Sequence, residues 1–272
     1  MDRPSATSLI GQQTVYQAKI FIRTPVAAFF TLVFPLMLLV LFAAIFGSEE
    51  IEELGVTVAQ YFAPALAVFA AANATYSNVG VGTAYQRDEG ILKRVKGTPL
   101  PAWVFFTGKM AASTAIAAVA TVIMMAVGVF AYGITIYPRT LAAATLTFLV
   151  GTACFAALGL LVAAVSPTGG AATAITNATL LPIAFLSGLF IPTTSESPQW
   201  ILTVGNFFPL KHFNDAFQQA FLPGTTGAQF DWGAIGYMAL WGFVALLLGL
   251  RLFKWETTQG TGRTKRDKVK VD

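Results

Sequence analysis

Six apolar stretches without Asp, Glu, Lys or Arg, each at least 18 residues long, dominate this 272-residue sequence. A bilayer core about 30 Å thick is crossed by roughly 20 helical residues, so each stretch can span a membrane. Charged residues make up only 11% of the chain, too few to cover a soluble protein of this size. The sequence therefore predicts an all-α polytopic membrane protein whose six transmembrane helices cover Pro25–Phe46, Gln60–Gly82, Met110–Ala131, Leu141–Val165, Gly169–Ile191 and Gly233–Leu250.

The intervals between these stretches leave no room for a soluble domain. They hold 13, 27, 9, 3 and 41 residues, and only the last can carry structure of its own. We expect an amphipathic interfacial helix over residues 1–24, a six-span domain over 25–253 and a basic tail over 254–272. In the first helix, the predicted apolar side carries Ile10, Ala18 and Phe21, and the predicted polar side carries Gln13 and Lys19.

The basic residues indicate the orientation of the chain. With Lys109 at the mouth of the third stretch set apart, fourteen of the 17 Lys and Arg lie before the first stretch, between the second and third, or after the sixth, which all share one side. The positive-inside rule makes this side, with both termini, cytoplasmic in the plasma membrane. These residues form no continuous basic stripe, so no nucleic-acid partner is expected, whereas membrane lipids are an expected partner of the basic tail.

Few residues could support catalysis or metal binding. The chain has one cysteine, Cys154, and one histidine, His212, which excludes an internal disulfide framework and leaves no metal-ligand set. No catalytic, cofactor-binding or metal residue is expected in this chain. Because the six stretches contain no Asp or Glu, ion-coupled transport is disfavoured. Lys109, near the start of the third stretch, is expected to extend toward the membrane surface.

The loop between the second and third stretches predicts a short helix. Asp88 and Glu89 are typical of a helix start, three basic residues are typical of its end, and Gly97 suits a left-handed cap. Its apolar residues form a ridge that favours docking into a groove of another protein. The alternative is a surface helix whose basic residues serve only to orient the chain in the membrane. The segment consists of Arg87, Asp88, Glu89, Gly90, Ile91, Leu92, Lys93, Arg94, Val95 and Lys96.

Two further patterns stand in the outer half of the chain. In the 192–232 interval, Phe213, Phe217 and Phe221 recur at helical spacing and predict an amphipathic helix at the outer surface, either an outer gate or an interfacial cap. Polar residues inside the stretches, including Asn73 and Asn177, predict contacts between helices or a wet path.

The run from Glu89 to Arg94, followed by Thr98-Pro99, resembles the cytoplasmic loop of ABC type-2 exporter permeases. The run from Leu186 to Pro192 resembles the end of that family's fifth span and the start of its short outer re-entrant helices. Ile91 stands where the family often has threonine. The resemblance implies that residues Arg87 to Lys96 form a coupling helix that docks on an ABC ATP-binding subunit in a bacterial inner membrane. The chain has no phosphate-binding loop of its own, so ATP and Mg would bind that partner subunit.

The resemblance also implies a second permease copy or a paralogue, and outward transport of an amphipathic drug, antibiotic, lipid or lipid-linked glycan. Substrate would pass between facing first, second and fifth spans, which makes Phe34, Asn73, Asn177 and Phe185 candidates for the pathway. The residues Phe213, Phe217 and Phe221 are candidates for an outer gate. Two alternatives stay open: an ion-coupled secondary transporter, and a non-transporting membrane scaffold.

Overall fold

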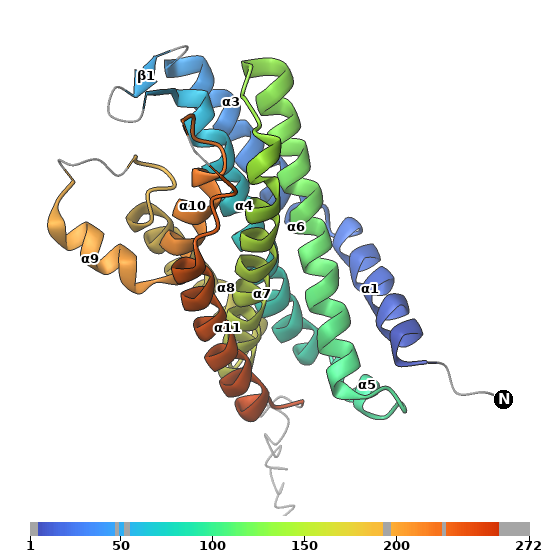
Figure 1. Cartoon of the computed structure of the whole chain (residues 1–272). Helices are drawn as coiled ribbons and strands as arrows, with labels where there is room; N and C mark the ends of the chain where they lie inside the picture. Colours follow the sequence, from blue (N-terminus) through green and yellow to red (C-terminus); the bar gives the residue numbers. More distant parts are fainter. Residues whose placement is uncertain (1–4, 47–48, 52–54, 193–196, 225–226, 256–272) are drawn as a thin grey trace, which may run out of the picture.

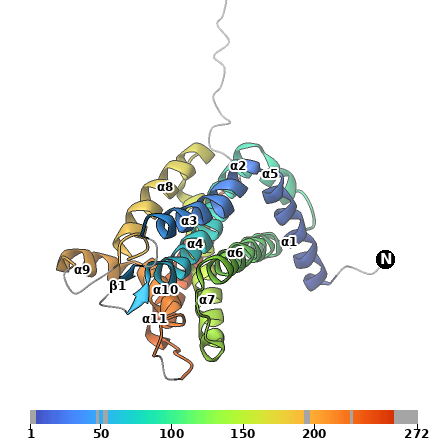
Figure 2. The same ribbon diagram turned by 90° about the horizontal axis from the view of Figure 1, so that it is seen from above.

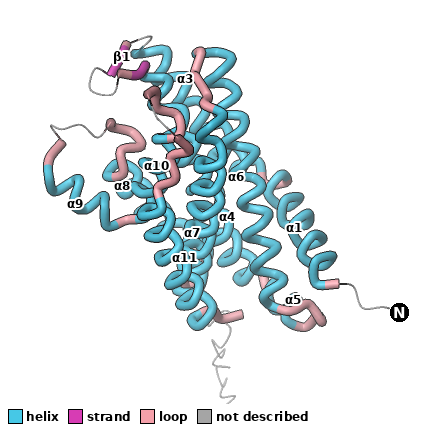
Figure 3. The backbone as a smooth tube through the Cα atoms, in the orientation of Figure 1, coloured by secondary structure: helices cyan, strands magenta, loops and turns pink. Residues whose placement is uncertain are grey.

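The computed structural model describes residues 5–46, 49–51, 55–192, 197–224 and 227–255, and these residues are almost entirely helical (Figures 1 and 3). Within them, six helical segments are long and apolar enough to cross a membrane, which confirms the predicted all-α, six-span architecture. They are Phe29–Phe46 (η1, Phe29–Val33, with α3, Phe34–Phe46), α4 (Val58–Asp88), α6 (Ala102–Tyr132), Pro138–Val165 (η2, Pro138–Thr140, with α7, Leu141–Val165), α8 (Gly169–Leu186) and α11 (Trp232–Leu252).

The remaining elements are shorter. They are α1 (Ala6–Ile22), α2 (Pro25–Ala28), β1 (Glu50–Ile51), β2 (Val56–Thr57), α5 (Ile91–Lys96), α9 (Gln199–Phe207) and α10 (Pro209–Gln219). The two strands pair antiparallel, with Glu50 opposite Thr57. We call the end of the bundle that carries α5 the basic end and the end that carries β1–β2 the hairpin end. The first residues of α1 and the last of α11 both lie at the basic end (Figure 1). Of the basic tail expected over 254–272, residues 256–272 lie outside the described residues.

Helix α4 is the centre of the bundle. It is surrounded by α3, α6, α7, α8 and α10 (Figure 2), and its alanine-rich sequence lets these neighbours approach closely. The closest approach is to α7, where a methyl group at Gly159 would lie 2.5 Å from the carbonyl oxygen of Tyr76. Gly80 of α4 faces Gly159. A methyl group at Gly80 would lie 3.1 Å from the carbonyl oxygen of Gly159. These two glycines therefore set the distance between α4 and α7.

The first span begins with a π-helical turn, η1, whose cause is Pro35. In this register the N–H of Phe34 donates to the carbonyl of Phe29, five residues back. The next donor would be Pro35, which has no N–H, so the carbonyl of Phe30 loses its partner within the helix. The side-chain amide of Asn73 on α4 donates to that carbonyl at 3.4 Å. Asn73 thereby joins the first span to the central helix.

The predicted faces of the N-terminal helix are partly wrong. Helix α1 packs along α6, but its buried residues are Gln17 and Phe21, and Gln13 packs against Gly108. The apolar residues Val15 and Tyr16 are more than half exposed instead. The reason is that Gln17 of α1 accepts a hydrogen bond from the buried amide of Gln86 on α4, whereas apolar side chains that face lipid cost nothing. The interfacial position of α1 stays a prediction.

The segment before the last span re-enters the bundle. In the first half of α10, Phe213 stacks on Phe155 near the middle of α7, with ring centroids 6.3 Å apart. Further along, Phe217 meets Phe148, and the Thr140 hydroxyl at the start of α7 donates to the carbonyl of Ala220. Helix α10 therefore runs from the middle of the bundle back to the hairpin end, as the expected re-entrant helices do.

Candidate functional site

The predicted coupling segment begins later than the sequence indicated. Helix α4 continues to Asp88, and Gly90 takes the left-handed conformation with φ of 71° before α5 begins at Ile91. The expectation that Asp88 and Glu89 open the short helix is therefore wrong. Gly97 follows α5 with φ of −77°, so it is not the left-handed residue. The chain reverses at Gly90 because a left-handed residue ends α4, and glycine adopts that conformation without strain.

The apolar residues of α5 do not form a free ridge. Leu92 is fully buried, and only Ile91 and Val95 are partly accessible. Leu92 inserts into a group that we call the basic-end cluster, formed by buried residues of α4, α5, α6 and α7: Val79, Leu92, Phe105, Phe106, Ala156 and Leu160. Burial of a leucine side chain contributes roughly 1.5–3 kcal/mol. Leu92 thus anchors α5 to three membrane-spanning helices and is not available to a partner.

Arg87 and Asp88 stabilise the turn between α7 and α8. The guanidinium of Arg87, 5% exposed, donates to the carbonyl of Ala163 at 2.9 Å and to that of Ser166, both at the C-terminal end of α7. The carboxylate of Asp88 accepts from the N–H of Gly169, the first residue of α8, at 2.6 Å. A cation at a helix C-terminus and an anion at a helix N-terminus complement the helix dipoles. Of these two predicted docking residues, Arg87 is buried, whereas Asp88 is exposed and bonded to the start of α8.

A buried cation lies beside this turn, between α1, α4 and α6. Lys109 is 2% exposed, and its Nζ donates to Oε1 of Gln86 at 2.7 Å. The amide of Gln86 then donates to Oε1 of Gln17 on α1 at 3.3 Å. No described acidic side chain lies within ion-pair distance of Lys109. The expectation that Lys109 extends to the membrane surface is wrong because α1 covers this side of α6.

The exposed part of the coupling segment is charged. The carboxylate of Asp88, which is exposed, is already bonded to Gly169. The other exposed side chains of this segment are those of Glu89, Lys93, Arg94 and Lys96. Together with the partly accessible Ile91 they form the docking face, the name we use below for this surface. The docking face is attached rigidly, because Leu92, Arg87 and Asp88 connect its base to α4, α6, α7 and α8. A force applied to the docking face would therefore reach several spans at once.

The four pathway candidates lie on three helices. Phe34 on α3 is half-buried and packs near Phe30, and Asn73 on α4 is held by its bond to the first span and by the Ser77 hydroxyl, which donates to it at 2.8 Å. Asn177 and Phe185 on α8 are both exposed. The structure thus brings the first pair to the contact between α3 and α4 and leaves the second pair on the outer surface of the subunit. Their role in a pathway stays a prediction.

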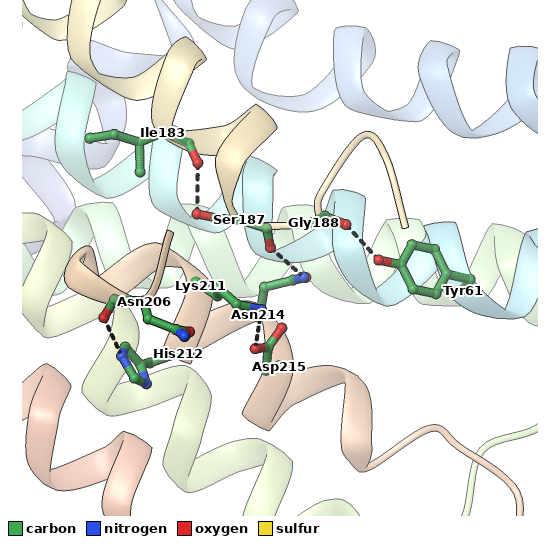
Figure 4. A network of polar contacts seen from close by, with 9 residues as sticks. All are labelled: Tyr61, Ile183, Ser187, Gly188, Asn206, Lys211, His212, Asn214 and Asp215. Atoms are coloured by element: carbon green, nitrogen blue, oxygen red, sulfur yellow. Dashed lines mark hydrogen bonds and ion pairs between the residues drawn. The ribbon is translucent and has the colours of Figure 1, made fainter. Parts of the chain in front are cut away.

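The three outer-gate candidates are packed, not exposed. Phe213, Phe217 and Phe221 are 0%, 4% and 4% exposed and fill the space between α10 and its neighbours. Their polar neighbours occupy the other face of α10, where Lys211 forms an ion pair with Asp215 at 2.7 Å (Figure 4). In this conformation the three rings fill the interface between α10 and α7 toward the hairpin end. A gating movement stays a prediction.

Polar bonds hold the loop after α8 to α10 and α4, as Figure 4 shows. The amide of Asn214 on α10 donates to the Ser187 carbonyl at 3.0 Å, and the Tyr61 hydroxyl on α4 donates to the Gly188 carbonyl at 2.6 Å. Ser187 also returns a bond to the carbonyl of Ile183 at 2.7 Å. Any outward movement of α10 has to break the bond from Asn214 to Ser187 or carry the loop with it.

Sequence reasoning missed that Arg87 and Asp88 bind the ends of α7 and α8 and that Lys109 is buried. One signal was available: only Ser166, Pro167 and Thr168 separate α7 from α8, so two helix ends meet there without a charged residue of their own. A neighbouring Arg-Asp pair complements both ends. Among the described residues no group of three or more His, Cys, Asp or Glu is placed to hold a metal ion.

Fold and site together define the class of protein, a multi-pass membrane subunit with a short charged helix anchored at one end. The model of the ABC-2 type transporter family matches residues 10–222, and the chain belongs to this family. Two similar proteins, from Escherichia coli K12 and Escherichia coli O157:H7, are both described as "Probable multidrug ABC transporter permease YbhR". Each is 26% identical over 142 residues, which is 52% of this chain and 38% of the relative. The chain therefore matches well under half the length of these curated relatives.

Proposed function

We propose that this chain is the permease subunit of an ATP-driven exporter and that it receives mechanical work through its docking face. Its membership of the ABC-2 family supports this proposal. The observation that carries it is the attachment of α5: Leu92 lies in the basic-end cluster while Lys93 and Arg94 beside it are exposed. A partner that moves α5 also moves α4, α6 and α7, as a rigid-body transmission requires. The basic end is then the cytoplasmic side.

The ATPase belongs to a separate ATP-binding subunit in this proposal, and that subunit carries ATP and Mg. The substrate class is amphipathic: a drug, an antibiotic, a lipid or a lipid-linked glycan. The two relatives are described as probable multidrug permeases, which supports a drug-like cargo. Each permease copy would contribute half of the pathway.

A second permease copy is proposed on the outer surface of α8. Asn177 is exposed on this membrane-spanning helix, and its side chain makes no hydrogen bond within the described ranges. An amide that faces lipid without a partner costs roughly 1–3 kcal/mol or more. A facing copy, or a paralogue, would supply the partner and place Asn177 and Phe185 beside a central path.

Co-purification tests the docking step. We expect an ATP-binding-cassette protein to purify with the wild-type chain and to be lost when Lys93→Glu and Arg94→Glu are combined. Reversing the charge of the docking face weakens its contact with that protein. Lys254→Glu, also exposed at the basic end but outside α5, is the matched control and should retain the partner.

The fold of each variant is checked by protection of the buried Cys154 from a thiol reagent. Retention of both the partner and its ATPase activity in the folded double variant would refute docking through α5. Transport driven by an ion gradient in vesicles without ATP would favour the secondary-transporter alternative.

A further inference from the structure

A long apolar groove lies between α6, α7 and α10 in the hairpin-end half of the bundle. Its volume is about 590 Å³, within the range of roughly 300–1,000 Å³ that small-molecule sites have. The groove runs along α6 from Ala118 to Phe130 and is closed on its inner side by Phe148 and Phe217. It opens onto the lipid-facing surface, where Phe130 is 90% exposed.

The dimensions of the groove fit one acyl chain of the surrounding leaflet. From Ala118 to Phe130 the helix rises about 18 Å, at 1.5 Å per residue. One leaflet contributes about 15 Å to the hydrocarbon core of a bilayer. Because α6 ends at the hairpin end, the groove occupies the depth of that leaflet only.

The chemistry of the walls also selects a hydrocarbon chain. The lining holds two threonines, and the hydroxyl of Thr145 already donates to the carbonyl of Leu141 at 2.7 Å. The buried hydroxyl of Thr121, which has no partner among the described residues, is therefore the single side-chain group that the lining offers to a polar ligand. All other lining residues are apolar. A drug with several polar groups would lose its hydrogen bonds to water without replacement in this groove.

An exposed cationic side chain, Arg139, lies at the hairpin end in the segment between two residues that line the groove. Ile136 and Leu141 line the mouth, and the exposed Arg139 lies between them in the sequence, with its guanidinium 5.5 Å from the Tyr137 ring. Guanidinium groups bind phosphate, and tyrosine is common at membrane interfaces. The charge at the mouth therefore complements a phospholipid headgroup whose chain enters the groove.

We infer that this groove binds a phospholipid of the hairpin-end leaflet, with one acyl chain between α6 and α7 and the phosphate at Arg139. The groove lies across α4 from α8, the helix proposed to face a second copy (Figure 2), so the lipid and that copy do not compete. Because Phe217 and Phe221 line the groove, the bound chain contacts the re-entrant helix α10 and supports its packed position.

Photolabelling with a phospholipid that carries a diazirine in one acyl chain tests this inference. The purified chain is placed in phospholipid vesicles without ATP or a partner, so the outcome is independent of the proposed transport function. We expect peptides from residues 118–130 and 141–148 to be labelled several-fold more strongly than the lipid-facing part of α11. The variant Ala126→Trp, which fills the groove, should lower this labelling to the level of α11, whereas Ala239→Trp, exposed on α11, should leave it unchanged.

A second variant from the opposite wall, Thr145→Phe, repeats the test if Ala126→Trp exposes Cys154 and is therefore misfolded. Arg139→Gln should reduce groove labelling roughly two- to fivefold, because the loss of an exposed ion contact weakens binding by about that factor. Uniform labelling of all lipid-facing helices, or groove labelling that survives both filling variants, would overturn the inference. A disulfide between two copies through Val122→Cys would assign the groove to a second copy and overturn it as well.

Discussion

The double cap formed by Arg87 and Asp88 gives the sharpest test of how α5 is attached. We consider Arg87→Met, which retains most of the side-chain volume but removes the guanidinium. Two bonds from a charged donor to the carbonyls of Ala163 and Ser166 are lost, at roughly 1.5–3 kcal/mol each. The Nε of Arg87 is buried and without a partner among the described residues, so its removal returns roughly 1–3 kcal/mol. We expect a net loss of about 3 kcal/mol.

The measurement uses the single, buried cysteine. Cys154 is 1% exposed, so the rate of its reaction with a fluorogenic maleimide during heating in detergent reports unfolding of the bundle. Arg94→Met is the matched control, since Arg94 is exposed on the docking face and no bond of its side chain is described. We expect the Arg87 variant to unfold several degrees lower and the Arg94 variant to unfold as the wild type does. Equal midpoints for the two variants would refute the capping argument.

Three further predictions follow from the packing. Gly159→Ala should destabilise the bundle by about 1–3 kcal/mol because the new methyl group meets backbone, while Gly236→Ala, in open space on α11, should be neutral in the same thiol assay. Gln86→Leu should destabilise by roughly 3–5 kcal/mol because it leaves a buried cation without its acceptor, whereas Lys109→Met removes the cation and should cost less; the reverse order in SDS unfolding would contradict this. Asn177→Cys should form a disulfide-linked dimer in oxidised membranes, and a chain that stays monomeric there would argue against a copy facing α8.

The spans could be predicted from the sequence because the bilayer imposes one requirement on every spanning helix. A helix must be apolar over roughly 20 residues, and this requirement is local, so it can be recognised without tertiary contacts. All six predicted stretches overlap the helices of the structure. Their ends differ: α4 extends to Asp88 and α6 begins at Ala102, because a helix can continue past the hydrocarbon region into the polar zone.

The coupling segment was only partly predictable. Its composition placed a short helix at the basic end, but composition does not say which side chains face inward. Leu92, Arg87 and Asp88 had the character of docking residues in the sequence, and each is instead engaged by α7, α8 or the basic-end cluster. The hydrogen-bond partners of Arg87 and Asp88 lie 76 to 81 residues away in the sequence, beyond the range of any local pattern.

The amino-acid sequence by itself determined that this protein lies in a membrane, how many spans it has and where its charged residues are located. Hydrophobicity and charge are properties of single residues and short windows, so no tertiary contact is needed to recognise them. Tertiary structure decided which of those charges serve the fold and which stay exposed. Lys109 illustrates the difference: its position near a helix start indicated the membrane surface, and the packing of α1 against α6 placed it in the interior. Burial depends on what covers a residue, and that is settled only when distant helices meet.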